Sequence, residues 1–148
     1  MTDSQGSIIS VEVDIPSELG YEKVVMALGA AVAKKAGFPT EKVEDLKTAI
    51  AEACTNAIEH GNSLDVHSKV QVELKVDGSS ITISVIDEGR NPIPNALPDR
   101  SLRSDFRGMG LFLIQMLMDH VEIKSRPGRN EIQMTSFLPS PLFGHPQI

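Results

Sequence analysis

Two alternating runs joined by a short Asp-Gly turn constrain the fold of this chain most. Residues Lys69 to Val76 and Ser80 to Ile86 place apolar side chains at every second position, the period of a strand with one buried face. Asp77-Gly78 lies between the two runs, and this dipeptide is a strong hairpin signal. The two runs are therefore predicted to be neighbouring antiparallel strands.

Further strands and helices are expected on both sides of this hairpin. Alternation and turn residues predict strands at Ile8 to Ile15, Val121 to Ser125 and Glu131 to Leu138. Helical spacing predicts helices from Ser17 to about Ala36, from Thr40 to Gly61, and from Gly108 to Asp119. Ser17 and Thr40 are the expected N-caps of the first two helices. Because helices and strands are grouped rather than strictly alternating, we expect an α+β two-layer sandwich with a largely antiparallel sheet.

Length and composition indicate one domain. The chain has 148 residues, of which 41% are hydrophobic, enough to form one core. We expect a single domain over residues 1–148, with a core of about 8–138 and a proline-rich tail at 139–148. The formal net charge of −6 argues against nucleic acid as a direct ligand, because binding to phosphate backbones needs an excess of Lys and Arg.

Neither a disulfide nor a membrane span is expected. Cys54 is the only cysteine, and its place in an apolar helical run favours a core position over a role as nucleophile. The segment from Met1 to Ser7 is polar, and no apolar run approaches the ~18 residues of a membrane-spanning helix. The expected location is the cytoplasm.

Glu52 and Asn56 form the first candidate site. They stand one helical turn apart, so their Cβ atoms are expected ~5–6 Å from each other on one face. The apolar residues of the same helix occupy another face, so Glu52 is predicted to point away from the core. A carboxylate and an amide oxygen so placed leave room for one metal ion and one water. An ordinary solvated helix face explains the same pattern.

Two glycine-bearing segments form the second candidate site. Asp87 ends a strand and is followed shortly by Gly89, so a buried carboxylate there could accept the exocyclic amine of adenine. Gly108 and Gly110 open an apolar helix, whose first N–H groups are suited to an anion. A plain turn at Asp87 and a close backbone approach at the glycines remain the alternatives.

The segment between these glycines concentrates positive charge in an acidic protein. It contains three prolines and reads as a loop, and its arginines and those beside it are Arg90, Arg100, Arg103 and Arg107. This cluster marks a place where a phosphate could bind, although a loop made soluble by arginine accounts for it equally well. The chain has no Walker A motif and lacks the third glycine of a dinucleotide fingerprint.

Three segments together resemble the nucleotide boxes of a known family. AEACTNAIEHG at residues 51–61, VIDEG at 85–89 and RGMGLFLI at 107–114 are similar to those of the bacterial anti-sigma-factor serine kinases. These kinases belong to the GHKL superfamily, with the Bergerat ATPase fold also seen in histidine kinases, gyrase and Hsp90. The resemblance covers nearly the whole chain. It implies a largely antiparallel mixed sheet with helices on one face.

The resemblance also implies a role for each matching residue. Glu52 would be the general base, Asn56 the Mg²⁺ ligand, and Asp87 the residue that reads the adenine amine of ATP or ADP. Residues 91–106 would be the ATP lid. The remaining implied nucleotide-binding residues are Gly89, Arg103, Arg107, Gly108, Met109 and Gly110.

Family members phosphorylate a serine of a small anti-anti-sigma (STAS) protein, bind a sigma factor, and form homodimers. A non-catalytic, nucleotide-sensing module that sequesters a partner is the competing hypothesis, and a small ATP hydrolase is a third. One departure stands out: many relatives have a threonine near the start of the last strand that helps hold adenine. Here that stretch is Glu131-Ile132-Gln133 and Thr135 lies later, so the adenine side is expected to be completed differently.

Overall fold

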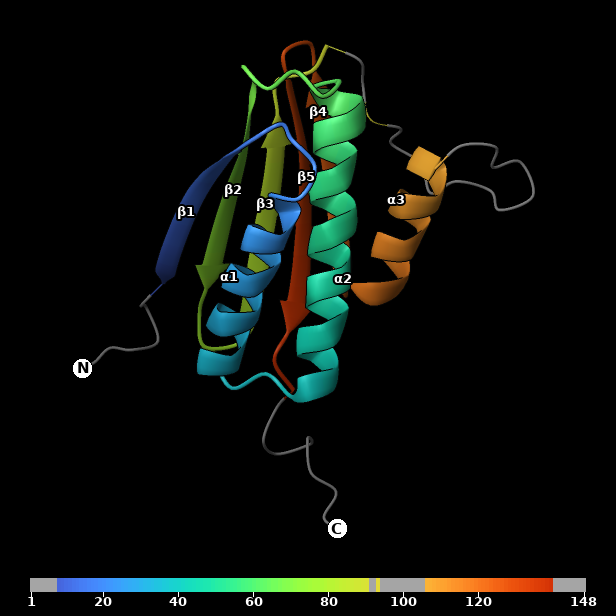
Figure 1. Ribbon diagram of the computed structural model, residues 1–148. Helices are drawn as coiled ribbons and strands as arrows, with labels where there is room; N and C mark the ends of the chain where they lie inside the picture. Colours follow the sequence, from blue (N-terminus) through green and yellow to red (C-terminus); the bar gives the residue numbers. More distant parts are fainter. Residues whose placement is uncertain (1–7, 91–92, 94–105, 140–148) are drawn as a thin grey trace.

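The computed structural model describes residues 8–90, 93 and 106–139, and of residues 106–109 it describes the backbone alone. Figure 1 shows a twisted sheet with its helices packed in front of it. The elements in chain order are β1 (Ile9–Pro16), α1 (Glu22–Lys35), α2 (Thr40–Asn56), the π-helical turn η2 (Ala57–Gly61), β2 (Lys69–Val76), β3 (Ser80–Asp87), α3 (Phe106–Leu117), β4 (His120–Arg126) and β5 (Arg129–Phe137).

The five strands form one sheet in the order β1-β2-β3-β5-β4. All four neighbouring pairs are antiparallel, so no parallel pair occurs among the described strands. The predicted hairpin is confirmed: the carboxylate of Asp77 accepts the backbone N–H of Ser79 at 2.7 Å and of Ser80 at 2.8 Å. These two backbone donors lower the pKa of Asp77, since they stabilise its ionised form.

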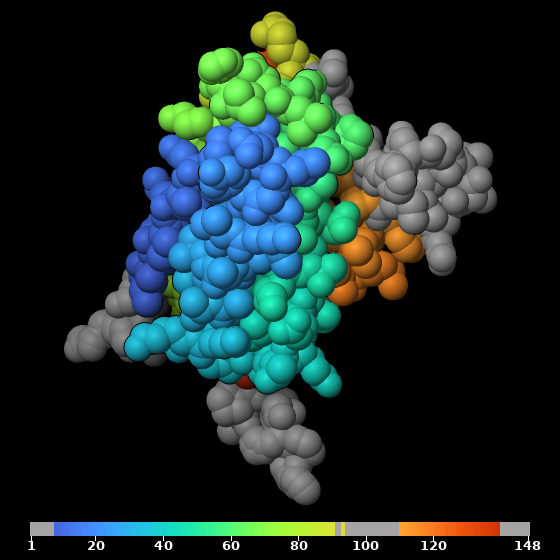
Figure 2. All heavy atoms as spheres, viewed as in Figure 1, coloured from blue at the N-terminus to red at the C-terminus, as the bar shows by residue number. Residues whose placement is uncertain are grey.

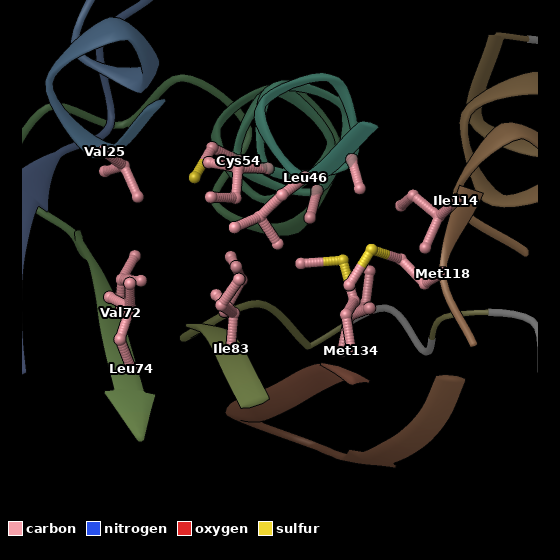
Figure 3. Close-up of a cluster of buried hydrophobic side chains, with 14 of the residues drawn as sticks. Val25, Leu46, Cys54, Val72, Leu74, Ile83, Ile114, Met118 and Met134 are labelled. Atoms are coloured by element: carbon pink, nitrogen blue, oxygen red, sulfur yellow. The ribbon is translucent and has the colours of Figure 1, made fainter. Parts of the chain in front are cut away.

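The three helices cover one face of the sheet, which confirms the α+β two-layer sandwich (Figure 1). α2 is central and packs against α1 on one side and α3 on the other. In Figure 2, α1 and α2 hide most of the sheet behind them. Figure 3 shows the core between the layers, where side chains such as Leu46 of α2 and Ile83 of β3 meet and are fully buried.

Cys54 belongs to this core, as the sequence predicted. Its side chain on α2 is fully buried (Figure 3), and burial raises the pKa of its thiol to about 12, with a smaller contribution from the charge of Glu22. The thiol therefore stays neutral and packs as a small apolar group.

Several helix ends differ from the sequence prediction. α1 begins only at Glu22, and Thr40 is the first residue of α2 after the N-cap Pro39, with no side-chain cap at either helix. At its other end α2 does not continue as an α-helix to Gly61 but widens into η2 after Asn56. α3 begins at Phe106, two residues before the predicted start. None of the described helices is long and apolar enough to span a membrane.

Candidate functional site

Asp87 is the buried acid at the end of β3. Its side chain is 2% exposed, and its Oδ1 accepts the backbone N–H of Gly89 at 2.8 Å and the side-chain amide of Asn130 at 3.0 Å. Asn130 lies directly opposite Asp87 in the ladder between β3 and β5. Two donors on one oxygen fix the orientation of this carboxylate.

Two glycines let the backbone close around that carboxylate. A Cβ atom added at Gly61 would lie 2.1 Å from Oδ2 of Asp87, and one added at Gly89 would lie 1.9 Å from the carbonyl oxygen of Gly61. No larger residue fits at either position without moving backbone or the buried acid. The end of η2 and the turn after β3 are therefore in direct contact, and Gly61 joins the predicted Gly89 as a residue that shapes the site.

The side chain of Asn62 stabilises the contact between the end of η2 and the turn after β3. Its buried side chain donates to Oγ of Ser17 at 2.8 Å and to the carbonyl of Lys69 at 3.0 Å, and it accepts the N–H of Glu88 at 2.8 Å. The expectation that Ser17 caps α1 was wrong. Ser17 is buried and donates its hydroxyl to the carbonyl of Ser68 at 2.9 Å, because the polar groups of the turn after η2 need partners where water is excluded.

Glu52 and Asn56 stand one turn apart on α2 and share one face of that helix. Glu52 is half-buried, and a Cβ atom added at Gly110 of α3 would lie 3.0 Å from its Oε1. Its carboxylate therefore stands against the first turns of α3. As predicted, Glu52 points away from the core between α2 and the sheet. It is not fully open to solvent, however, because α3 packs against this face of α2.

Asn56 is buried rather than exposed. Its side chain is 6% exposed, and neither its amide nitrogen nor its amide oxygen has a hydrogen-bond partner within the described part of the chain. A buried polar group without a partner costs roughly 1–3 kcal/mol. Such an unpaired group beside a carboxylate indicates that this position serves a ligand.

The first turns of α3 supply the remaining predicted residues. Arg107, Gly108 and Met109 lie in the helix, where only their backbone is described, and Gly110 is buried against Glu52. The helix is 12 residues long, so the N–H groups at its start form a positive pole. Arg103 lies outside the described residues, and its assignment stays a prediction.

These groups gather at one end of the domain. In Figure 1 the C-terminal end of α2, the end of β3 and the start of β5 all lie at the upper end of the sheet, and α3 stands beside α2. The widened turn η2 links Asn56 to Gly61 at the buried acid. Turns of this type occur often at functional sites.

Sequence reasoning missed Gly61, Asn62 and Asn130 as parts of the site. The sequence predicts Gly61 only as a helix end, whereas in the structure it closes the π-helical turn five residues after Asn56, the last residue of α2. Asn130 could be found only from the register of β5 against β3. Among the described residues, no group of three or more His, Cys, Asp and Glu side chains could hold a metal ion alone.

Comparison with known proteins identifies a family with this fold. A family model described as "Histidine kinase-like ATPase domain" matches residues 15–136. The chain is 31% identical over 138 residues to the "Serine-protein kinase RsbW" of Halalkalibacterium halodurans, covering 87% of this chain and 83% of that protein. It is 32% identical over 138 residues to the "Anti-sigma F factor" of a Thermoanaerobacter species, covering 88% and 94%.

A solved structure of the RsbU and RsbW domains of a Mycobacterium tuberculosis protein superposes with a TM-score of 0.67 and 21% identity, over 90% of this chain and 33% of that one. At this identity the likeness concerns the fold alone. The chain belongs to the histidine kinase-like ATPase domain family. Within that family it stands with the RsbW serine-protein kinases and the anti-sigma F factors, with which it shares about 30% identity over most of its length.

Proposed function

We propose that this protein is an ATP-dependent serine protein kinase and an anti-sigma factor. The names of its relatives, a serine-protein kinase and an anti-sigma F factor, support both roles. The observation that carries the proposal is the position of Glu52, whose carboxylate stands against Gly110 at the start of α3. A carboxylate beside the positive pole of a helix lies where it can serve a hydroxyl that attacks a bound phosphate.

ATP would lie between α2 and the start of α3. Asp87 would accept the exocyclic amine of adenine, and Gly61 and Gly89 would let the backbone close around that carboxylate and hold it in place. The phosphates would take the backbone N–H groups around Gly108, Met109 and Gly110. The side chains of Arg103 and Arg107 are the proposed cationic partners of the phosphates.

The residues present fit a magnesium ion. Mg²⁺ prefers oxygen ligands, keeps several waters, and is bound by one or two protein groups together with substrate phosphates. The buried amide oxygen of Asn56 has no partner in the described part of the chain, and it would be the protein ligand. The ion, when bound, neutralises negative charge on the phosphates.

Transfer then needs a proton acceptor and alignment. Glu52 takes the proton of the substrate serine as its Oγ forms a bond to the γ-phosphorus. The bond from that phosphorus to the bridging β-phosphate oxygen breaks, and ADP leaves with the electron pair. The products are phosphoserine and ADP, with the proton left on Glu52 for release to water.

The proposed partners are a sigma factor and a STAS-domain anti-anti-sigma protein that carries the serine. The name of the Thermoanaerobacter relative supports the sigma factor. We place this regulator in the cytoplasm and expect it to act as a homodimer, which sedimentation of the purified chain tests.

The test is transfer of label from γ-³²P-ATP to candidate STAS proteins, comparing the wild type with Glu52→Gln. We expect the variant to lower the transfer rate by about 10²–10⁴-fold while its affinity for ATP stays within about threefold. Glu44→Gln is the matched control, since Glu44 is an exposed glutamate near the start of the same helix.

Three results would change the proposal. Equal labelling by the wild type and Glu52→Gln rejects Glu52 as the base. No labelling with intact ATP binding identifies the non-catalytic binding module, and release of phosphate without any protein partner identifies a hydrolase.

A further inference from the structure

Asn130 is a fully buried amide at the point where β5 begins. Its nitrogen donates to Oδ1 of Asp87 at 3.0 Å and to the carbonyl oxygen of Gly89 at 3.1 Å. One side chain thus holds both the acid at the end of β3 and the turn that follows it.

Ser125 fixes the orientation of that amide from the neighbouring strand. Its hydroxyl donates to Oδ1 of Asn130, and its oxygen accepts the backbone N–H of Ile93 at 3.1 Å. A hydroxyl has one proton, so the bond accepted from Ile93 leaves that proton for Asn130. Ile93 is itself buried in the core.

The hydrogen bonds from Ile93 to Asp87 form a series in which every donor points the same way. Ile93 donates to Ser125, Ser125 donates to the amide oxygen, and the amide nitrogen donates to Asp87. A flipped Asn130 would turn its oxygen toward two acceptors, Asp87 and the carbonyl of Gly89, which is unfavourable. The hydrogen bonds from Gly89 and Asn130 therefore both end on Oδ1 of Asp87.

We propose that Asn130, oriented by Ser125, is the positioning residue that sets the Asp87 carboxylate for recognition of the adenine amine. This inference rests on the proposed function, in which Asp87 reads that amine. Without Asn130, Oδ1 of Asp87 loses the donor that β5 supplies and keeps the N–H of Gly89, so the carboxylate is held less firmly about its χ2 angle. Removal of Asn130 should therefore weaken the binding of nucleotides whose base has an exocyclic amine and leave the binding of the others unchanged.

The experiment compares two nucleotides that differ only in that amine. Calorimetry with Mg²⁺ measures the affinities of ATP and of purine riboside triphosphate, which lacks the 6-amino group, for the wild type, Asn130→Ala and Ser125→Ala. We expect the wild type to prefer ATP by at least about tenfold, the worth of one hydrogen bond to a charged group. In Asn130→Ala that preference should fall to about twofold or less, chiefly through weaker ATP binding.

Ser125→Ala keeps the test open if Asn130→Ala fails to fold, because it removes only one hydroxyl from a half-buried site. It should reduce the preference in the same direction by a smaller factor. Ser136→Ala is the matched control: Ser136 is a buried serine of β5 that lies far along the strand from Asn130, and its loss should leave the preference unchanged.

Each other result has a distinct meaning. A wild type that prefers ATP, with equal weakening of both nucleotides in Asn130→Ala and Ser125→Ala, shows a purely structural role and overturns the inference alone. A wild type that binds both nucleotides equally overturns base reading by Asp87. A wild type that binds neither overturns the proposed function together with the inference.

Discussion

Gly61 lies directly against the carboxylate of Asp87, so that a Cβ atom at position 61 would stand 2.1 Å from Oδ2. This contact joins the widened end of α2 to the buried acid of β3. The Asp87 carboxylate cannot move away easily, because Asn130 and Gly89 donate hydrogen bonds to its other oxygen, Oδ1.

Gly61→Ala should therefore displace the acid and weaken ATP binding by at least about tenfold, with a loss of about 1–3 kcal/mol in unfolding free energy from overpacking. Calorimetry and urea denaturation measure the two effects. Gly78→Ala is the control, because a Cβ atom at Gly78 meets nothing within 4 Å. Unchanged ATP affinity in Gly61→Ala would contradict the assignment of Asp87 to the base.

Asn56 should contribute to binding at the expense of stability. Replacing its unpaired amide with Leu removes a buried polar group without a partner among the described residues, so we expect the unfolding free energy of the ligand-free protein to rise by about 1 kcal/mol. The same change should abolish the gain in ATP affinity that Mg²⁺ gives. Urea denaturation and calorimetry with and without Mg²⁺ test both expectations.

Asn62→Leu is the matched comparison, since Asn62 is equally buried but makes three hydrogen bonds. It should lower the unfolding free energy by about 2 kcal/mol or more, because three partners lose their bonds. Loss of stability in Asn56→Leu of the same size would show that Asn56 has a structural role instead.

Lys42 and Asp119 join the start of α2 to the segment after α3. Lys42 Nζ lies 2.9 Å from Oδ2 of Asp119, and the same oxygen accepts the backbone N–H of Phe137 at 2.7 Å. Partial burial raises the pKa of Asp119, but the bonds from Phe137 and Lys42 outweigh it and hold the pKa below its ordinary value.

A lowered folded-state pKa means that this contribution to stability is complete above the unfolded-state value of about 3.9 and is lost as pH falls through the folded value. Asp119→Asn should be less stable than the wild type at pH 7, and the difference should shrink as pH falls below about 4. Thermal unfolding from pH 7 to pH 2 measures it. A difference independent of pH would refute a role for the charge.

Local sequence patterns were sufficient where the interaction itself is local. Asp77-Gly78 defined a hairpin, and Glu52 and Asn56 shared a face because a helix repeats every turn. The pairing of Asp87 with Asn130 depends on β5 inserting between β3 and β4, an order that no local pattern specifies. Likewise, Ser17 carries the usual signal of a cap, but its bonds to Asn62 and Ser68 arise only when distant turns meet.

The most direct measurement is calorimetric titration of the purified chain with a non-hydrolysable ATP analogue, with and without Mg²⁺. The account predicts saturable binding that tightens when Mg²⁺ is present. Asn56 would then be a ligand of the ion, and the charge of the ion would reduce the repulsion among the phosphates. Absence of binding to the analogue even with Mg²⁺ would contradict the central claim that α2, Asp87 and the start of α3 together form a nucleotide pocket.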